Sequence, residues 1–373
     1  MKSVIIIGAG ILGASTAYHA AKAGAQVTVI DRADAGQATG AAAGIVCPWI
    51  SQRRNQAWYR IAKSGAKYYP RLIEELWQLG EENTGYKQVG IVSIHEDSKL
   101  DKMEAKARER FEDAPEMGVL ERLDAEETKR RFPSSSGEYG SLYVSGAARV
   151  DGGAVRDALL RAAVSNGAVI VDADASLERL PSGEIGVRAA GQLSTADAIV
   201  SAGGAWAAEL FRPLGLEMAV VPQKAQILEL QTTDRETGDW PVAMVPFGQY
   251  IVPFPDGRIV AGATHENDAG FDTRLTAGGL HHILDKVLDV APGFGDATFT
   301  KAITGFRPST LSALPFIGKV PTLTNVFAAN ALGASGLTAG PYFGKELAKL
   351  ALGGTSELPL EEYSIEEAFG GGR

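Results

Sequence analysis

Three glycines and one carboxylate near the start of the chain have the types and spacing of a nucleotide-binding site. Gly8, Gly10 and Gly13 follow the pattern G-x-G-x-x-G. Gly8 suits a tight turn, Gly10 lets the backbone approach a pyrophosphate, and Gly13 lets a helix pack on the preceding strand. Asp31 follows about 20 residues later, where its carboxylate could accept hydrogen bonds from ribose hydroxyls. The chemistry indicated is the binding of a dinucleotide.

The segments around these residues fit a strand, helix, strand unit. Residues 4–7 are one Val and three Ile, which is typical of a strand buried in a parallel sheet. A helix of small residues reaches Gly24, and residues 26–31 form a second strand, so the helix N-terminus faces the phosphates. The chain has 44 glycines in 373 residues, so the motif is weak without this pattern. The alternatives are a glycine turn without a ligand and a secretory signal formed by the apolar run.

The length and net charge of the chain limit which classes of function are possible. A chain of 373 residues can form two domains with a large core. The net charge of −9 and the shortness of the one basic cluster, residues 129–131, argue against nucleic acid. No apolar run approaches the roughly 18 residues that span a bilayer. We expect a cytoplasmic protein and leave open peripheral attachment at the inner face of the membrane and a homo-oligomer.

Cysteine and histidine usage limits redox and metal chemistry. The single cysteine, Cys47, excludes an intramolecular disulfide and a Cys-x-x-Cys pair. His281 and His282 are adjacent, and neighbours on a helix point about 100° apart, which makes a poor metal site. We expect no bound metal.

Several downstream segments also carry structural signals. Residues 35–44 have so few large side chains that their backbone could lie against a large flat ligand, with a flexible linker as the alternative. Residues 55–82 have helical spacing, and Pro70 predicts a break into two helices. Residues 198–204 form an apolar strand that ends in two glycines, as at a ligand crevice. Residues 250–263 predict an antiparallel hairpin that turns at Asp256 and Gly257.

In their order and spacing, these motifs resemble the D-amino-acid oxidase family of FAD-dependent oxidoreductases. The chain is most similar to the glycine oxidase and small D-amino-acid dehydrogenase branch of that family. The matching segments are residues 8–13 with Asp31, then 41–44, 201–206, 250–253 with 262–264, 305–308 with 315–318, and Gly336 before the last helix.

The resemblance implies an α/β fold with two discontinuous domains. One is a Rossmann-type FAD-binding domain of the glutathione-reductase type, expected over residues 1–85, 146–220 and 300–373. The other is an α+β substrate-binding domain on a mainly antiparallel sheet, expected over residues 86–145 and 221–299. Sarcosine oxidases tether flavin through a cysteine late in the chain, whereas Cys47 is early. The FAD should therefore be non-covalent.

The resemblance also implies where FAD binds. The adenine half would lie on the N-terminal unit, and the flavin ring between residues 41–44 and the start of the last helix, whose glycine-rich turn offers N–H groups to an anion. The expected cofactor-binding residues are Gly8, Gly10, Ile11, Leu12, Gly13, Asp31, Arg32, Thr39, Ala41, Ala42, Ala43, Gly44, Ile45, Ser176, Ala202, Gly203, Trp206, Arg307, Gly333, Ala334, Ser335, Gly336, Leu337 and Thr338.

Three side chains are candidates for the catalytic site. In the family, the arginine at the position of Arg307 binds the substrate carboxylate, which suits a guanidinium that can form two parallel bonds. Tyr250 would lie on the substrate side of the flavin, and His265 would line the pocket. A surface ion pair, a core aromatic and a solvated loop histidine are the respective alternatives. Residues 334–336 lack the basic residue of glycine oxidase-like members, so the resemblance does not extend to the same substrate.

The leading hypothesis is oxidation of an amino acid, or an N-substituted amino acid, at its Cα–N bond. Hydride would pass to flavin N5, and the imino acid product would hydrolyse to a keto acid. No side-chain base is required if the amine enters deprotonated, and either O2 or a quinone could reoxidise the flavin. The alternatives are an NAD(P)-dependent dehydrogenase, with Arg32 as a phosphate reader, and a flavin-binding sensor or subunit without turnover.

Overall fold

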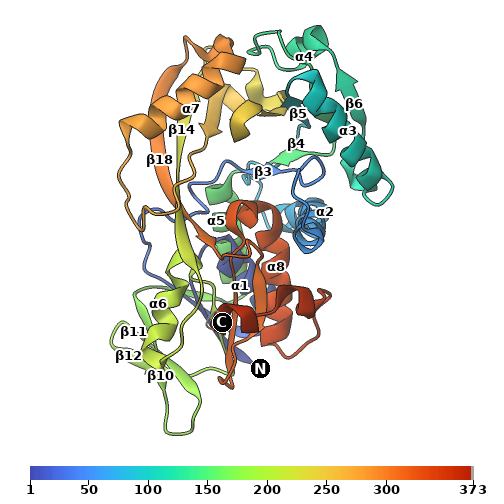
Figure 1. The fold of residues 1–373 in the computed structure, drawn as a ribbon. Helices are drawn as coiled ribbons and strands as arrows, with labels where there is room; N and C mark the ends of the chain where they lie inside the picture. The colour runs from blue at the N-terminus through green and yellow to red at the C-terminus, as the bar shows by residue number, and fades with distance from the viewer. Residues whose placement is uncertain (371–373) are drawn as a thin grey trace.

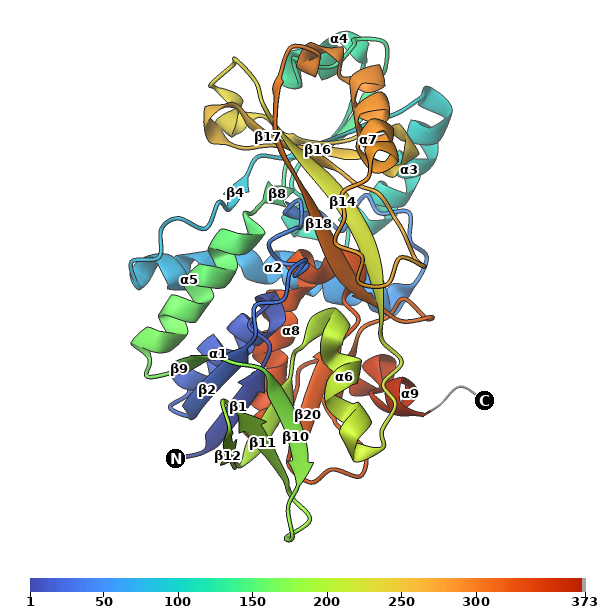
Figure 2. The same ribbon diagram turned by 90° about the vertical axis from the view of Figure 1, so that its left-hand side faces the viewer.

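The computed structural model describes residues 1–370 and is built on two large sheets, one above the other in Figures 1 and 2. The lower sheet has six strands in the order β19-β20-β13-β1-β2-β9, and all its pairs are parallel except β19 with β20. Its strands are β1 (Ser3–Ile7), β2 (Gln26–Asp31), β9 (Val169–Asp172), β13 (Ala198–Ser201), β19 (Phe316–Lys319) and β20 (Val326–Asn330).

Apolar residues cover both faces of this lower sheet, as the run of isoleucines predicted. Val4 and Ile6 pack in one core with α1 (Ile11–Lys22), α5 (Gly152–Ser165) and α8 (Gly336–Ala351). Ile5 and Ile7 point to the opposite face because successive strand side chains alternate. There they pack with a three-stranded sheet of β10 (Ala175–Arg179), β11 (Ile185–Ala189) and β12 (Gln192–Ser194), and with α6 (Ala207–Phe211).

The upper sheet has eight strands in the order β18-β14-β17-β16-β15-β5-β7-β6. It is mainly antiparallel, with β15 and β5 as a parallel pair. Its strands are β5 (Ile91–Ile94), β6 (Leu120–Leu123), β7 (Ser141–Val144), β14 (Val221–Gln231), β15 (Val242–Met244), β16 (Tyr250–Pro253), β17 (Arg258–Gly262) and β18 (Thr298–Ser309). Asp256 and Gly257 have φ of +60° and +80°, which confirms the predicted hairpin turn. These observations confirm the predicted fold class.

The longest ladder joins β14 to β18 and connects the two halves. Figure 2 shows this pair running from the upper sheet down toward the lower one. Because β18 pairs with β14 from Thr298 to Ser309, residues 300–309 lie in the antiparallel sheet. The division predicted from the sequence had placed these residues in the FAD-binding domain.

Residues 56–78 form one helix, α2 (Gln56–Gln78), and the predicted break at Pro70 is wrong. Packing against α8 explains the continuity: a Cβ on Gly65 would lie 2.1 Å from the Thr338 carbonyl oxygen, so the two helices are in close contact there. The buried face of α2, which includes Tyr69 and Leu72, continues on both sides of the proline. Tertiary packing along this face thus outweighs the missing backbone N–H.

The remaining elements of the upper half and of the connection between halves are α3 (Asp97–Phe111), α4 (Ala125–Arg131), α7 (Ala277–Val290) and a small sheet of β3 (Ile45–Val46), β8 (Ala148–Arg149) and β4 (Lys87–Gln88). The short helix α9 (Glu366–Phe369) lies in the lower half (Figure 2) and packs in the core that contains Ile5 and Ile7. Asp124 and Glu127 form a capping box at the start of α4. Within residues 1–370, no helix has the length and apolar character needed to cross a membrane.

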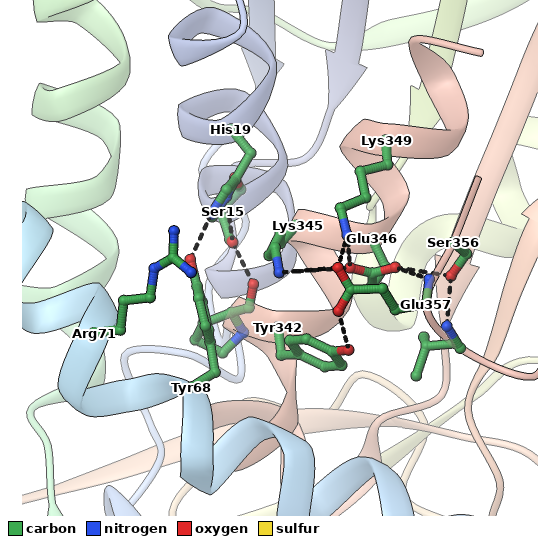
Figure 3. Close-up of polar contacts among 12 residues, drawn as sticks. Ser15, His19, Tyr68, Arg71, Tyr342, Lys345, Glu346, Lys349, Ser356 and Glu357 are labelled. Carbon is green, nitrogen blue, oxygen red and sulfur yellow. Dashed lines mark hydrogen bonds and ion pairs between the residues drawn. The ribbon is translucent and has the colours of Figure 1, made fainter. Parts of the chain in front are cut away.

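A polar cluster ties the segment after α8 back onto this helix (Figure 3). The buried Glu346 carboxylate accepts hydrogen bonds from Lys349 Nζ (2.7 Å), Ser356 Oγ (2.9 Å) and the Glu357 backbone N–H (2.6 Å). Buried carboxylates are stable only when they are hydrogen-bonded and paired with cations, as Glu346 is here. The cluster thereby fixes the C-terminal side of α8, whose N-terminal side reaches the cavity described next.

Candidate active site

A cavity of about 410 Å³ lies where the parallel strands of the lower sheet end. The residues that end β1, β2 and β20, or directly follow β9 and β13, line this cavity, as expected for a ligand crevice in an open α/β sheet. It extends from Asp31 to Arg307 and Tyr250, and so reaches the upper sheet. Every predicted cofactor residue lines it except Gly13, Ser335 and Thr338.

The glycine motif closes one end of the cavity. Gly8 has φ of +104°, and a Cβ there would lie 2.4 Å from the Ala202 carbonyl oxygen. A Cβ on Gly13 would lie 1.8 Å from the Gly8 carbonyl oxygen, so Gly13 acts in helix packing and lies behind the cavity wall. The first N–H of α1, that of Ile11, donates to Thr39 Oγ1 (2.9 Å). The N-terminus of α1 thus faces the cavity with its positive dipole end.

Asp31 organises the backbone at this end. One carboxylate oxygen accepts from the Ala9 N–H (2.6 Å), and the other accepts from the Ala33 N–H (2.7 Å) and Gln37 Nε2 (2.8 Å). A carboxylate has about four acceptor positions, so ribose hydroxyls can still bind alongside these donors. Asp31 therefore holds the glycine loop as well as facing the cavity, a role that the motif spacing did not predict.

Arg32 lies among three carboxylates. Its guanidinium pairs with Asp34 (2.6 Å), Asp174 (3.1 Å) and Glu209 (2.9 Å), which raises the pKa of Arg32 above its usual range. These partners offset its charge and would repel a phosphate. The arrangement therefore disfavours Arg32 as the reader of an NADP phosphate.

Residues 35–44, the segment with few large side chains, are firmly packed and form the floor of the middle of the cavity. Gly44 has φ of +85°, and a Cβ there would lie 1.8 Å from the Val150 carbonyl oxygen. A Cβ on Gly305 would lie 2.5 Å from Ala41 Cβ, so β18 passes directly over this segment. The linker interpretation of residues 35–44 is therefore wrong.

The N-terminus of α8 lines the opposite side of the middle of the cavity through Gly333, Ala334 and Gly336. Ser335 and Thr338 have their side chains engaged elsewhere. Ser335 Oγ accepts from Trp58 Nε1 (2.9 Å), and Thr338 Oγ1 donates to the Ile45 carbonyl (2.9 Å). These two bonds fix the start of α8 against α2 and β3.

The three catalytic candidates meet at the upper end of the cavity. Arg307 donates to Nδ1 of His265 (3.0 Å) and to Gln223 Oε1 (3.4 Å), and its positive charge acts to lower the pKa of the Tyr250 hydroxyl. Arg307 and Tyr250 line the cavity, whereas His265 lies beside them with its side chain only partly buried. A side chain at position 262 would clash with the Tyr250 ring, with a Cβ 2.9 Å from its oxygen, which explains the glycine of the residue 262–264 motif.

The pKa values of Tyr250 and His265 are shifted in opposite directions. Burial raises the pKa of Tyr250, although Arg307 opposes the shift. Burial lowers the pKa of His265, and the positive charges of Arg307 and Arg53 lower it further. His265 is consequently neutral at physiological pH, and Tyr250 keeps its proton.

An aromatic group covers the cavity between its two ends. Trp206 lines the cavity, stacks on Phe271 with ring centroids 4.9 Å apart, and meets the edge of Phe306 at 5.9 Å. Phe271 belongs to the segment between β17 and α7. Lys224 holds this segment in place through an ion pair with Asp272 (3.3 Å). The aromatic group thus joins both sheets.

Sequence reasoning missed several residues of the site. Gln37, Gln223, Ala225 and Phe271 were not predicted, and the last three lie in the upper half, where no motif marked them. Residues 173–175 also line the cavity, and their position directly after the strand at 169–172 was a usable signal.

Comparisons with known proteins agree with this geometry. The family model described as FAD dependent oxidoreductase matches residues 3–350. The chain belongs to this family. It is 57% identical over 365 residues to the uncharacterized oxidoreductase YurR of Bacillus subtilis, covering 97% of this chain and 98% of that protein. It is 28% identical over 355 residues to a glycine oxidase of Bacillus licheniformis, covering 94% and 92%.

Among solved structures, the iminodiacetate oxidase of Chelativorans sp. BNC1 superimposes with a TM-score of 0.94 at 43% identity. The alignment covers 97% of this chain and 98% of that one. The predicted family and its FAD cofactor are thus confirmed.

The residues present fit FAD. The glycine loop and the α1 N-terminus suit the pyrophosphate, and the flat wall of residues 41–44 opposite the α8 N-terminus suits an extended ring system. FAD would therefore bind in this cavity, next to Arg307 and Tyr250.

Proposed function

We propose that this oxidoreductase oxidises an amino acid, or an N-substituted amino acid, at its Cα–N bond. The observation that supports this proposal most strongly is that Arg307 and Tyr250 lie at the upper end of the cavity. A guanidinium there would bind the substrate carboxylate through two parallel hydrogen bonds and so orient Cα toward the middle of the cavity. The relatives that oxidise glycine and iminodiacetate, both amines with a carboxylate one carbon away, support this assignment.

The remaining residues have supporting roles in this proposal. Gln223 and His265 hold the Arg307 guanidinium in place. Tyr250, protonated and largely buried, would donate a hydrogen bond to the substrate carboxylate. The N–H groups at the start of α8 would stabilise negative charge in the middle of the cavity. No side chain is needed as a base, because the substrate amine would bind in its neutral form.

When bound, FAD supplies the acceptor of the substrate hydride at its N5 atom. The Cα–N bond of the substrate would become an imine, and water would hydrolyse the imino acid to a keto acid and an amine or ammonia. We propose O2 or a quinone as the final electron acceptor.

A spectroscopic titration tests the proposal. The purified protein should be yellow, and anaerobic addition of amino acids of both enantiomers and of N-substituted glycines should bleach the flavin absorbance with at least one compound. Oxygen uptake compared with reduction of a soluble quinone would then identify the acceptor. A yellow protein that no amine bleaches would refute the proposed reaction.

A further inference from the structure

Trp58 of α2 holds the serine that begins α8. Ser335 is the N-cap residue of α8, and its hydroxyl oxygen accepts a hydrogen bond from Trp58 Nε1 at 2.9 Å. Both residues are buried. An N-cap serine usually turns this oxygen toward a backbone N–H two or three residues into its own helix. Within residues 1–370, Ser335 makes no such capping bond, and its oxygen is directed to Trp58.

The first turn of α8 therefore lacks the cap that its own serine could supply. The first four N–H groups of an α-helix have no acceptor within the helix, and they carry the positive end of the helix dipole. This end of α8 lines the middle of the cavity through Gly336 and Leu337. A serine oxygen turned into the helix would compete with any acceptor atom that a ligand presents to these N–H groups.

Two other contacts with α2 hold the first turn of α8 in place of a cap. The carbonyl of Leu337 would normally accept from the N–H of residue 341, but Pro341 has none. The buried Tyr69 hydroxyl donates to this carbonyl at 2.6 Å. Gly65 lies against the Thr338 carbonyl, since a Cβ would be 2.1 Å from its oxygen. α2 thus fixes the start of α8 without a serine cap.

The α2 residues that make these contacts lie on one face of the helix. Positions 58, 65 and 69 are separated by close to whole helical turns. One face of α2 therefore does two things at the start of α8. It supports the first turn, and it draws the capping oxygen away from it.

We propose that Trp58 is a positioning residue for the cofactor. By holding the Ser335 hydroxyl away from α8, it leaves the first-turn N–H groups available to the flavin ring of FAD and so raises the reduction potential of the flavin. Reduction adds negative charge to the ring, and N–H donors at a helix N-terminus stabilise such charge. This inference uses the binding of FAD in the cavity and goes beyond the proposed function, since it does not depend on the substrate.

The test measures the midpoint potential of the bound flavin in the wild type and in four variants. The flavin is reduced anaerobically with xanthine and xanthine oxidase beside a reference dye. Trp58→Phe keeps the aromatic packing and removes the N–H donor, so the Ser335 hydroxyl can turn into α8. We expect this variant to favour the oxidised flavin about tenfold more than the wild type does, a shift of about 30 mV to more negative potential.

Two variants at position 335 separate competition for the N–H groups from a merely structural effect. Ser335→Ala breaks the same hydrogen bond but leaves no oxygen to compete, so it should keep the wild-type potential. The double variant Trp58→Phe, Ser335→Ala should recover the wild-type potential for the same reason. A structural defect caused by the loss of the indole would not be repaired by removing a second polar group.

Trp77→Phe is the control, because Trp77 lies on the same helix and is 61% exposed. Its flavin should have the wild-type potential. FAD content and thermal unfolding, measured on every variant, show whether a change in potential accompanies a change in folding.

An unchanged potential in Trp58→Phe would overturn the proposal, and so would an equal fall in Trp58→Phe and in the double variant. A fall in Ser335→Ala would also overturn it, because the bond itself would then matter and the competing oxygen would not. None of these measurements uses an amine. Failure of every amine to bleach the flavin would therefore refute the proposed reaction and leave the role of Trp58 standing.

Discussion

Nδ1 of His265 lies 3.0 Å from the guanidinium of Arg307 and accepts a hydrogen bond from it. Only a neutral imidazole can do so, because both ring nitrogens of a protonated histidine are donors. Burial and the nearby arginines keep the pKa of His265 below its usual value, so this bond persists through neutral pH. The contact leaves the other Arg307 nitrogens free for a carboxylate.

Replacing Arg307 should therefore affect substrate binding most strongly. We expect Arg307→Ala to lower kcat/KM for a carboxylate substrate about 100-fold, equivalent to about 2.7 kcal/mol, chiefly by raising KM. Arg307→Lys should recover part of the loss, since an ammonium keeps the charge but not the two parallel bonds. Steady-state kinetics with Arg179→Ala, which replaces an exposed arginine at the end of β10, provide the control. Unchanged kinetics in Arg307→Ala would remove this residue from the site.

Two glycines with positive φ offer a matched test of the nucleotide end. A Cβ on Gly8 would clash with the Ala202 carbonyl, whereas a Cβ on Gly24 would meet nothing within 4 Å. Gly24→Ala should cost about 1 kcal/mol of folding stability through its φ of +83° alone and retain FAD. Gly8→Ala should be purified with little flavin, as measured by the ratio of absorbance at visible and ultraviolet wavelengths. Equal flavin content in both variants would contradict the role given to Gly8.

The nucleotide end was predictable because its signals are local. Gly8, Gly13 and Asp31 lie within one strand, helix, strand unit, and the backbone geometry of that unit largely determines their roles. These residues are close together in the sequence, so the motif alone is enough to predict how they are arranged. The same holds for the hairpin turn at Asp256 and Gly257, where two residues fix the turn type.

The upper end of the site was only partly predictable. Arg307 and Tyr250 came from the family resemblance, but Gln223 reaches Arg307 because β14 and β18 pair in a particular register. The register between two strands so far apart in the sequence depends on the tertiary fold, and local sequence patterns do not reveal it. The error at Pro70 has a similar origin, since packing of α2 on α8 overrides a local signal for a break.

The chemistry of Cys47 can be tested by alkylation. Burial raises the pKa of this thiol to about 12, so almost no thiolate exists at pH 8. We expect iodoacetamide to leave the folded protein unmodified for hours and to label it fully after unfolding in guanidinium, as read by intact mass. Cys47→Ala should bind FAD as the wild type does, and acid precipitation should release the flavin from both proteins. Flavin that remained attached to the wild-type chain alone would show a covalent link through Cys47.

Because His19 is buried, we expect the protein to lose stability in mild acid. Figure 3 shows it between Ser15 and Tyr68: Nδ1–H donates to the Ser15 carbonyl (2.7 Å), and Nε2 accepts from the Tyr68 hydroxyl (2.6 Å). Burial lowers the pKa of His19 from 6.5 to about 4. His95, also buried, has its pKa lowered to about 4. Both histidines are therefore neutral in the folded protein at pH 5 and protonated in the unfolded chain.

Because the folded pKa lies below the unfolded one, the unfolded state binds more protons as the pH falls through 6.5. Stability should therefore decrease from about pH 6.5 toward pH 4, by about 2 kcal/mol per histidine at pH 5 relative to pH 7.5. Urea unfolding at these two pH values measures the change. His19→Gln should be less stable than the wild type at pH 7.5, since it loses the bonds of the ring, but its stability should fall by only about half as much on going to pH 5. A variant as acid-sensitive as the wild type would show that His19 is already protonated in the folded state, and that the Tyr68 hydroxyl does not donate to Nε2.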